Sequence, residues 1–178
     1  DTPGDDNFLN ETKFATHVCD SALFVIGAVL GVKGQTIKFA NLLKEKNVPT
    51  AIVINKLDRE RANFDSTLSQ IKEMLPVRPV VIQLPIGAED DFKGYVDIVS
   101  GKAYLFDGDK GGVKETEVPA DMADEVESYR ESLMENVAET DDDLIEKFLE
   151  EMELSEEEML SGLKNAVKNA ELSPVCVC

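Results

Sequence analysis

Two short polar stretches carry residue types that could recognise a nucleotide. The first is NKLD, Asn55 to Asp58, which directly follows the apolar run Thr50 to Ile54. A carboxylate such as Asp58 can accept both the ring N–H and the exocyclic amine of guanine, a donor pair that adenine lacks. Asn55 can brace the loop and contact the base edge, and the aliphatic stem of Lys56 can cover the ring face. A loop at the carboxyl end of a parallel strand is where α/β proteins bind ligands, so the position predicts a guanine site.

The second stretch is DTPG, Asp1 to Gly4. Asp1 can hold a water bound to Mg²⁺, because Mg²⁺ keeps several of its waters and uses few carboxylates. Gly4 has no side chain, so its backbone N–H can come close to a terminal phosphate. Thr2 and Pro3 complete this candidate phosphate loop. In a chain without the NKLD stretch, a surface turn would be the preferred interpretation of DTPG.

Strand and helix patterns alternate along the first part of the chain and would position both loops. Residues Ser21 to Val29 form a near-continuous apolar run, as expected of a strand that is covered on both faces. A helical pattern follows over 35–47, then the strand Thr50 to Asn55, and then a second helical pattern over 66–75. This order predicts an α/β fold with a parallel sheet.

After Pro76 the pattern changes to short strand candidates and then to acidic helices. Gly and Pro separate the short strands, and the helices carry apolar stripes that predict core contacts. The last segment, Leu172 to Cys178, has the pattern of one more buried strand. We therefore expect part of one domain over 1–75, an inserted α+β subdomain over 76–170 and a returning strand over 171–178. Both ends of the sequence are predicted to be cut edges.

Acidic residues outnumber basic ones by 36 to 18, which gives the chain a formal net charge of −18. This charge would repel a nucleic-acid backbone, so DNA or RNA binding by the chain as a whole is disfavoured. A basic protein partner is favoured instead, although the acid could also serve solubility alone. No apolar run reaches membrane-spanning length, and the three cysteines do not make a disulfide framework. These features predict a soluble protein of a reducing compartment, the cytoplasm.

Several longer stretches together resemble the translational GTPase elongation factor G over nearly the whole chain. The block at 78–104 is much more specific than NKLD, and the module at 119–139 is what separates elongation factor G from the tRNA-carrying factors. The stretches are DTPG at 1–4, AVLGVKGQT at 28–36, VPTAIVINKLDR at 48–59, RPVVIQLPIGAEDDFKGYVDIVSGKAY at 78–104 and PADMADEVESYRESLMENVAE at 119–139.

The resemblance implies a partial GTPase domain with a P-loop-GTPase-type parallel sheet and an inserted subdomain, often called G-prime. It implies a parent protein that binds GTP or GDP with Mg²⁺ and acts on the ribosome in translocation. It assigns Asn55, Lys56 and Asp58 to guanine, and Asp1 to Gly4 to the phosphate-sensing switch II, with Asp1 holding Mg²⁺ through water. It also implies that the inserted subdomain meets the acidic-stalk protein of the ribosome.

The chain departs from the family pattern because the sequence contains no phosphate-binding G-x-x-x-x-G-K-[ST] motif. That motif supplies the backbone cradle for the α- and β-phosphates. We therefore expect the 178-residue chain by itself to bind GTP weakly or not at all. A truncated sheet edge beside Ser21 to Val29 would also invite pairing between copies of the chain.

Asp5 is a second departure, since elongation factor G ordinarily has a His here that orients the attacking water. An ionised Asp is only an acceptor and would lie beside an anionic phosphate, which predicts impaired hydrolysis. The alternative is that Asp5 orients the water adequately, because Asp can also act as a base. Gly27 stands where members of the family commonly have Asp, and Gly34 stands where many have Pro. These two replacements indicate a divergent paralogue. Three functions remain open for the parent protein. They are a translocase, a GTP-binding regulator that does not hydrolyse GTP, and a ribosome-protection or release-type relative.

Overall fold

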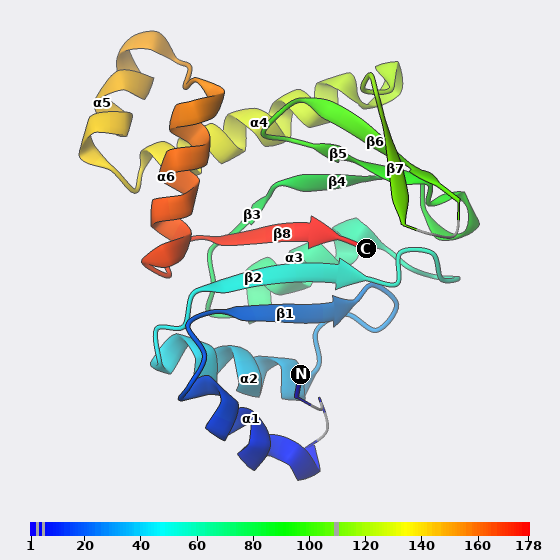
Figure 1. Ribbon diagram of the computed structural model, residues 1–178, viewed down its shortest axis with the longest axis vertical. Helices are drawn as coiled ribbons and strands as arrows, with labels where there is room; N and C mark the ends of the chain where they lie inside the picture. Colours follow the sequence, from blue (N-terminus) through cyan, green and yellow to red (C-terminus); the bar gives the residue numbers. More distant parts are fainter. Residues whose placement is uncertain (3, 5, 109–110) are drawn as a thin grey trace.

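Two four-stranded sheets, one parallel and one antiparallel, organise the described part of the chain (Figure 1). The computed structural model describes residues 1–2, 4, 6–108 and 111–178, with Asp6 and Glu151 described by their backbone only. Among the described helices, none is long and apolar enough to cross a membrane. The elements are η1 (Asp6–Phe8), α1 (Leu9–Thr16), β1 (Ala22–Gly27), α2 (Gly34–Glu45), β2 (Thr50–Asn55), α3 (Phe64–Met74), β3 (Pro79–Val81), β4 (Gln83–Ile86), η2 (Glu89–Asp91), β5 (Gly94–Asp97), β6 (Lys102–Asp107), β7 (Gly112–Thr116), η3 (Ala120–Met122), α4 (Ala123–Ala138), α5 (Asp142–Glu151), α6 (Glu156–Lys168) and β8 (Ser173–Val177).

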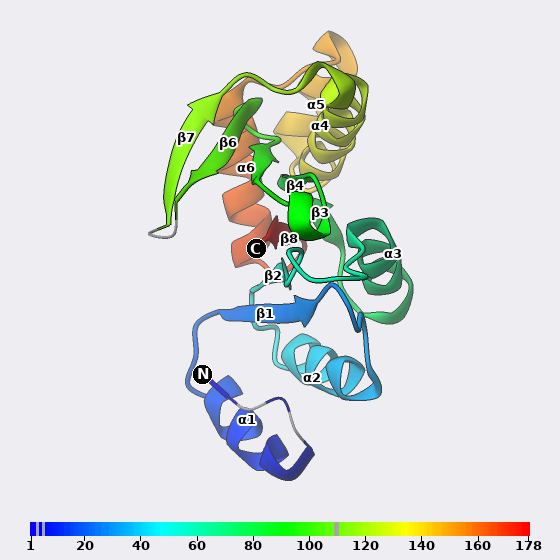
Figure 2. The same cartoon turned by 90° about the vertical axis from the view of Figure 1, so that its right-hand side faces the viewer.

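The parallel sheet has the strand order β1-β2-β8-β3. Its core face carries Ile52 and Ile54 of β2 and Val175 of β8, all with no measurable exposure. Helices α2 and α3 lie on the same side of this sheet (Figure 2). Strands and helices that alternate in sequence thus form a parallel sheet with its helices packed on it, which confirms the predicted α/β class.

The opposite face of β1 is open, so the prediction of a strand covered on both faces is wrong for the described residues. Leu23 is 66% exposed and Val25 is 54% exposed. β1 is the edge strand of the parallel sheet, and both packed helices lie on the other side (Figure 2). An apolar run shows that a strand is apolar on both faces, but it does not show that the described part of the chain covers both.

One apolar run, residues 79–86, divides between the two sheets. β3 pairs in parallel with β8, whereas β4 pairs antiparallel with β5. Ile82 lies between them, and its N–H donates to Val175 O at 3.1 Å while its carbonyl accepts from Ile98 N at 3.0 Å. β3 therefore belongs to the parallel sheet, although it falls within the range 76–170 that we predicted for the inserted subdomain.

The antiparallel sheet, in the order β4-β5-β6-β7, packs one face against α4 (Figures 1 and 2). Val96 and Ala103 are fully buried on that face, together with Leu133 and Val137 of the helix. Arg130 of α4 donates to the carbonyl oxygens of Ile98 and Val99, which fixes the helix to the turn between β5 and β6. Helices α5 and α6 complete this half of the molecule.

Two helix starts follow from cap residues recognisable in the sequence. The Asp141 side chain accepts from the backbone N–H groups of Asp143 and Leu144 at the start of α5. Ser155 and Glu158 form a capping box at the start of α6. Each cap satisfies backbone donors that the first helical turn leaves free, which sets where the helix begins.

Gly94 is required where β5 approaches β6. A Cβ at this position would collide with the backbone oxygen of Tyr104 and lie 2.9 Å from the Cα of Leu105. Backbone atoms of a paired strand cannot move aside cheaply, so we expect Gly94→Ala to destabilise the chain by about 2–3 kcal/mol. Urea unfolding measures this change, with Gly34→Ala as the control because no atom lies within 4 Å of a Cβ there. Equal unfolding midpoints for the two variants would contradict the prediction.

Glu158 makes stability depend on pH at the start of α6. Its carboxylate accepts from Lys147 Nζ at 2.6 Å and from the Ser155 hydroxyl and N–H at 2.6 and 2.9 Å. The hydrogen bond from Lys147, and then those from Ser155, lower the pKa of Glu158 from 4.5 to about 2. A lowered folded-state pKa stabilises the fold above the unfolded pKa, and this contribution is lost as the pH falls toward 2.

Glu158→Gln should therefore lower the melting temperature at neutral pH, and the difference from wild type should shrink between about pH 4.5 and 2. Circular dichroism melts across this range measure it, with Glu157→Gln as the control on the same helical turn. A difference that stays constant down to pH 2 would show that the charge of Glu158 plays no part.

Candidate functional site

The NKLD loop lies at the carboxyl edge of the parallel sheet, directly after β2. Asn55 pairs in register with Gly27, and its carbonyl accepts from Ala28 N at 2.8 Å. The Asn55 side chain accepts from the N–H of Lys56 at 2.6 Å. Lys56 has a φ of 68°, so the chain turns sharply here. The Asn55 side-chain oxygen pairs with the Lys56 N–H, which this turn would otherwise leave without a partner. Asn55 therefore braces the loop, as its position in the motif predicts.

Leu57 anchors the middle of the loop. Its side chain is 1% exposed, its N–H donates to Cys178 O at 3.3 Å, and its carbonyl accepts from Glu89 N at 2.9 Å. The loop is therefore tied both to the end of β8 and to η2. With Leu57 held inward, the residues on either side are directed toward solvent.

Lys56 and Asp58 are both exposed on this anchored loop. The Asp58 carboxylate lies 3.5 Å from Arg59 Nε, and the side chains of the pair are 59% and 68% exposed. Such an exposed pair contributes little stability and is easily exchanged for another donor. Asp58 can therefore offer both carboxylate oxygens to the neighbouring N–H groups of a base.

Glu89 supports the far side of the loop, a role that the sequence did not reveal. Its Oε1 accepts from Arg61 N at 2.7 Å, in addition to the backbone bond to Leu57. Asn63 then caps α3 by accepting from Ser66 N at 2.7 Å. The sequence signal was present, since Glu89 belongs to the specific QLPIGAE stretch, but nothing local connects it to residues 57–61.

The DTPG residues occupy a different place, beside the edge strand β1. Asp1, Thr2 and Gly4 line a groove of about 480 Å³ between α1, α2 and β1. This groove includes none of Asn55, Lys56 and Asp58, so among the described residues the two motifs do not meet. Pro3 and Asp5, also predicted as site residues, lie outside the described residues.

Buried polar atoms without partners lie along the same groove. Thr12 Oγ1 and both side-chain polar atoms of Gln35 are buried and make no hydrogen bond within the described part of the chain. Buried polar groups are almost always paired, and an unpaired one costs about 1–3 kcal/mol. The groove is thus suited to receive a group that pairs with Thr12 and Gln35. No motif in the sequence marked Thr12, whereas Gln35 lies in the AVLGVKGQT stretch at 28–36.

The chain that carries this NKLD loop at the carboxyl edge of its parallel sheet is similar to known proteins. A family model described as the elongation factor Tu GTP-binding domain matches residues 1–176. The chain belongs to this family. The predicted recognition as a translational GTPase resembling elongation factor G is confirmed.

A solved relative extends the match to three dimensions. The crystal structure of a protein from Thermus thermophilus superposes with a TM-score of 0.90 at 29% sequence identity. The match covers 100% of this chain and 26% of the Thermus chain, so the chain spans about a quarter of that relative's length. A GTPase-type parallel sheet with an additional antiparallel sheet is therefore the fold class, as predicted.

The family implies Mg²⁺ beside a bound nucleotide, and the described residues offer it one predicted carboxylate, that of Asp1. They contain no group of three or more His, Cys, Asp or Glu side chains placed to hold a metal. Asp1 is exposed and lies in the groove with Thr2 and Gly4. Mg²⁺ is commonly held by one or two carboxylates, waters and the phosphates themselves, so this donor set fits a nucleotide-dependent ion.

Proposed function

We propose that this chain is the guanine-binding end and the inserted subdomain of an elongation-factor-G-like protein. The parent protein binds GTP or GDP with Mg²⁺ and acts on the ribosome in translocation, which would place it in the cytoplasm. The observation that carries the proposal is the exposed Asp58 carboxylate on a loop that Leu57 fixes at the carboxyl edge of the sheet. We assign residues 1–75 and 171–178 to the nucleotide-binding part and residues 76–170 to the inserted subdomain, except β3 (Pro79–Val81), which pairs with β8 in the parallel sheet.

Guanine selectivity follows from the acceptor chemistry of Asp58. One carboxylate oxygen accepts the ring N–H of guanine and the other accepts the exocyclic amine, displacing the loose contact with Arg59. Adenine offers no such donor pair and would leave a carboxylate unpaired against the base. The Lys56 stem covers the ring face, and Asn55 keeps the loop turned toward the base.

The phosphate end requires more than this chain supplies. Asp1 would hold Mg²⁺ through water, and Gly4 would bring its N–H to the terminal phosphate, with Thr2 and Pro3 completing the loop. The unpaired Thr12 and Gln35 in the adjoining groove support the seating of a further segment of the longer protein there. By itself, the 178-residue chain should bind a fluorescent GDP analogue weakly or not at all.

The open edge of β1 supports self-association of the isolated chain. Among the described strands, β1 pairs with β2 alone, and Leu23 and Val25 are exposed on its face. Unpaired strand edges recruit further strands, so copies of the isolated chain would associate through β1. A monomer at high concentration in light scattering would contradict this association.

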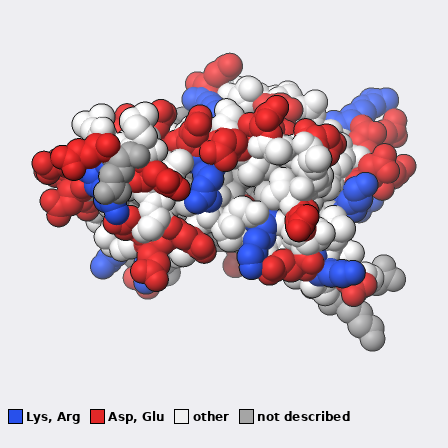
Figure 3. All heavy atoms as spheres, turned by 90° about the horizontal axis from the view of Figure 1, so that it is seen from above, with Lys and Arg blue, Asp and Glu red and all other residues white. Residues whose placement is uncertain are grey.

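The acidic helices support a protein partner on the ribosome. Asp and Glu side chains crowd the end of the molecule that α5 forms, on the left in Figure 3. Asp142, Asp143, Glu146 and Glu150 of this helix are all exposed. An acidic surface of this kind attracts a basic patch on a partner and speeds encounter at low salt. From the resemblance to elongation factor G, and not from the charge of α5, we also propose that the inserted subdomain meets the acidic-stalk protein of the ribosome.

A second candidate is a GTP-bound regulator that binds the ribosome without hydrolysing GTP. Asp5, in place of the family's usual His, is the observation that favours it. Both candidates need the same nucleotide site, and they differ in turnover alone.

Ribosome-stimulated hydrolysis of GTP by the full-length protein tests the proposal, with ATP as the control nucleotide. Turnover of GTP and not of ATP that requires ribosomes supports the translocation factor. GTP-dependent ribosome binding without turnover supports the regulator. A protein that neither binds ribosomes with GTP nor hydrolyses it would overturn both.

A further inference from the structure

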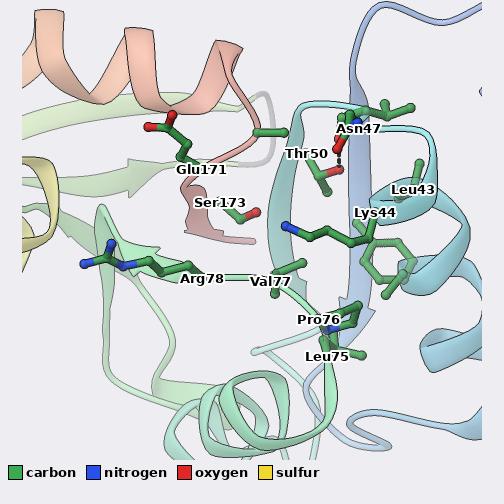
Figure 4. A pocket seen from close by; sticks show the side chains of 14 residues that line it. Leu43, Lys44, Asn47, Thr50, Leu75, Pro76, Val77, Arg78, Glu171 and Ser173 are labelled. Atoms are coloured by element: carbon green, nitrogen blue, oxygen red, sulfur yellow. Dashed lines mark hydrogen bonds between the residues drawn. The ribbon is translucent and has the colours of Figure 1, made fainter. Parts of the chain in front are cut away.

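A cavity of about 230 Å³ opens at the amino-terminal edge of the parallel sheet (Figure 4). It lies where β2 and β8 begin and where α2 and α3 end. β2 runs from Thr50 at this edge to Asn55, the first residue of the NKLD loop, and five steps of about 3.3 Å span roughly 17 Å. The cavity is therefore separate from the proposed guanine site. Its lining includes Leu43, Lys44, Asn47, Val48, Leu75 and Ser173.

The inner wall of the cavity is apolar. Leu43 and Val48 are each 8% exposed and Leu75 is 5% exposed, so little of each side chain meets water. Sites for drug-sized ligands usually measure about 300–1,000 Å³, so this cavity suits a smaller molecule. A short hydrocarbon tail would gain contact with these side chains and lose its own hydration.

Two polar groups point into the cavity without a partner. Ser173 is 7% exposed, its backbone N–H donates to Arg78 O at 2.9 Å, and its hydroxyl makes no hydrogen bond within the described part of the chain. Lys44 makes no ion pair within the described ranges, although acidic residues outnumber basic ones two to one in the chain. In Figure 4 the Lys44 ammonium and the Ser173 hydroxyl both point into the cavity.

The other charged groups at the rim are turned away or engaged. Arg78 is paired with Glu139 and also donates to Asn136 Oδ1 at 2.9 Å. The side chains of Arg78 and Glu171 point away from Lys44 in Figure 4. Thr50 already donates its hydroxyl to Val48 O at 2.8 Å. Among the described residues that line the cavity, the side-chain donors without a partner are thus the Lys44 ammonium and the Ser173 hydroxyl, with the Asn47 amide at the rim.

We propose that this cavity binds a small carboxylate with a short apolar tail. One carboxylate oxygen accepts from Lys44 Nζ and the other from the Ser173 hydroxyl, while the tail packs against Leu43, Val48 and Leu75. The net charge of −18 repels anions at long range. At 0.15 M salt, however, charges more than about 8 Å apart are largely screened, so the local donors decide binding.

Titration of the ¹⁵N-labelled 178-residue chain with hexanoate at 0.15 M salt tests the proposal by NMR. We expect saturable shifts of the Lys44, Asn47 and Ser173 amide signals, with weaker binding of both hexan-1-ol, which lacks the charge, and acetate, which lacks the tail. Lys44→Gln should weaken hexanoate binding about tenfold, the effect of losing a charge-assisted hydrogen bond. Ser173→Ala should weaken it less.

Lys46→Gln is the matched control, because Lys46 is exposed at the end of the same helix and does not line the cavity. Unchanged hexanoate affinity in Lys46→Gln together with the loss in Lys44→Gln supports the site. Equal affinity for hexanoate and hexan-1-ol, equal effects of the two lysine variants, or shifts that do not saturate would each overturn it. None of these outcomes depends on nucleotide binding.

Discussion

Asp58→Asn is expected to change the base preference of the full-length protein from guanine to xanthine. The carboxylate presents two acceptors, which match the ring N–H and the amine of guanine. Asparagine presents one acceptor and one donor, which match the ring N–H and the carbonyl oxygen that xanthine carries instead of the amine. The loss of two charge-assisted hydrogen bonds should weaken GDP binding by about 10²–10⁴-fold.

Competition between GDP, XDP and ADP for a fluorescent nucleotide measures this change of preference. Glu60→Gln is the control, because Glu60 is exposed in the same loop and its only ion pair among the described residues is a 3.9 Å contact with Arg61. GDP affinity in this control should equal that of wild type. If Asp58→Asn and Glu60→Gln bind GDP equally well, the loop does not select guanine and the proposed function loses its main support.

Asp5→His is expected to raise ribosome-stimulated GTP hydrolysis of the full-length protein. A residue that positions or activates water contributes typically about 10²–10⁴-fold to the rate. In the proposed site the terminal phosphate would repel an ionised Asp5, whereas a neutral His can accept a proton from the water without adding a negative charge. GDP affinity should stay unchanged, because GDP lacks the terminal phosphate and the substitution does not touch the base.

Single-turnover hydrolysis with saturating ribosomes measures the effect of Asp5→His, and Asp6→His is the control at the adjacent position. A rise confined to Asp5→His would favour the regulator that binds GTP without hydrolysing it. Wild-type turnover as fast as that of Asp5→His would show that the water is oriented in another way, and the translocation factor would then stand.

Local patterns in the sequence predicted the elements and one of the two loops well. The apolar run before NKLD placed this loop at the carboxyl edge of a parallel sheet, because strand and turn signals there are contiguous in sequence. The start of α6 at Ser155 and Glu158 is of the same local kind, because a capping box needs only four consecutive residues. The change of pattern after Pro76 indicated an inserted α+β subdomain, and the family resemblance then gave that subdomain a known counterpart.

Features that depend on distant residues could not be predicted in the same way. Leu57 is held by Cys178 and Glu89, and no local pattern joins these three positions. The run 79–86 enters two sheets because Ile82 bonds to both Val175 and Ile98, which periodicity cannot reveal. The exposure of Leu23 and Val25 likewise depends on which elements pack against β1, and not on the composition of the strand itself.

The central claim is that GDP binds at residues 55–58, and hydrogen–deuterium exchange of the full-length protein with and without GDP tests it most directly. Protection on adding GDP should appear in peptides that cover Asn55 to Arg59, and it should be absent from α5, which is remote from this loop (Figure 1). ADP at the same concentration should protect neither. Bound GDP that leaves the exchange of Asn55 to Arg59 unchanged would contradict the account.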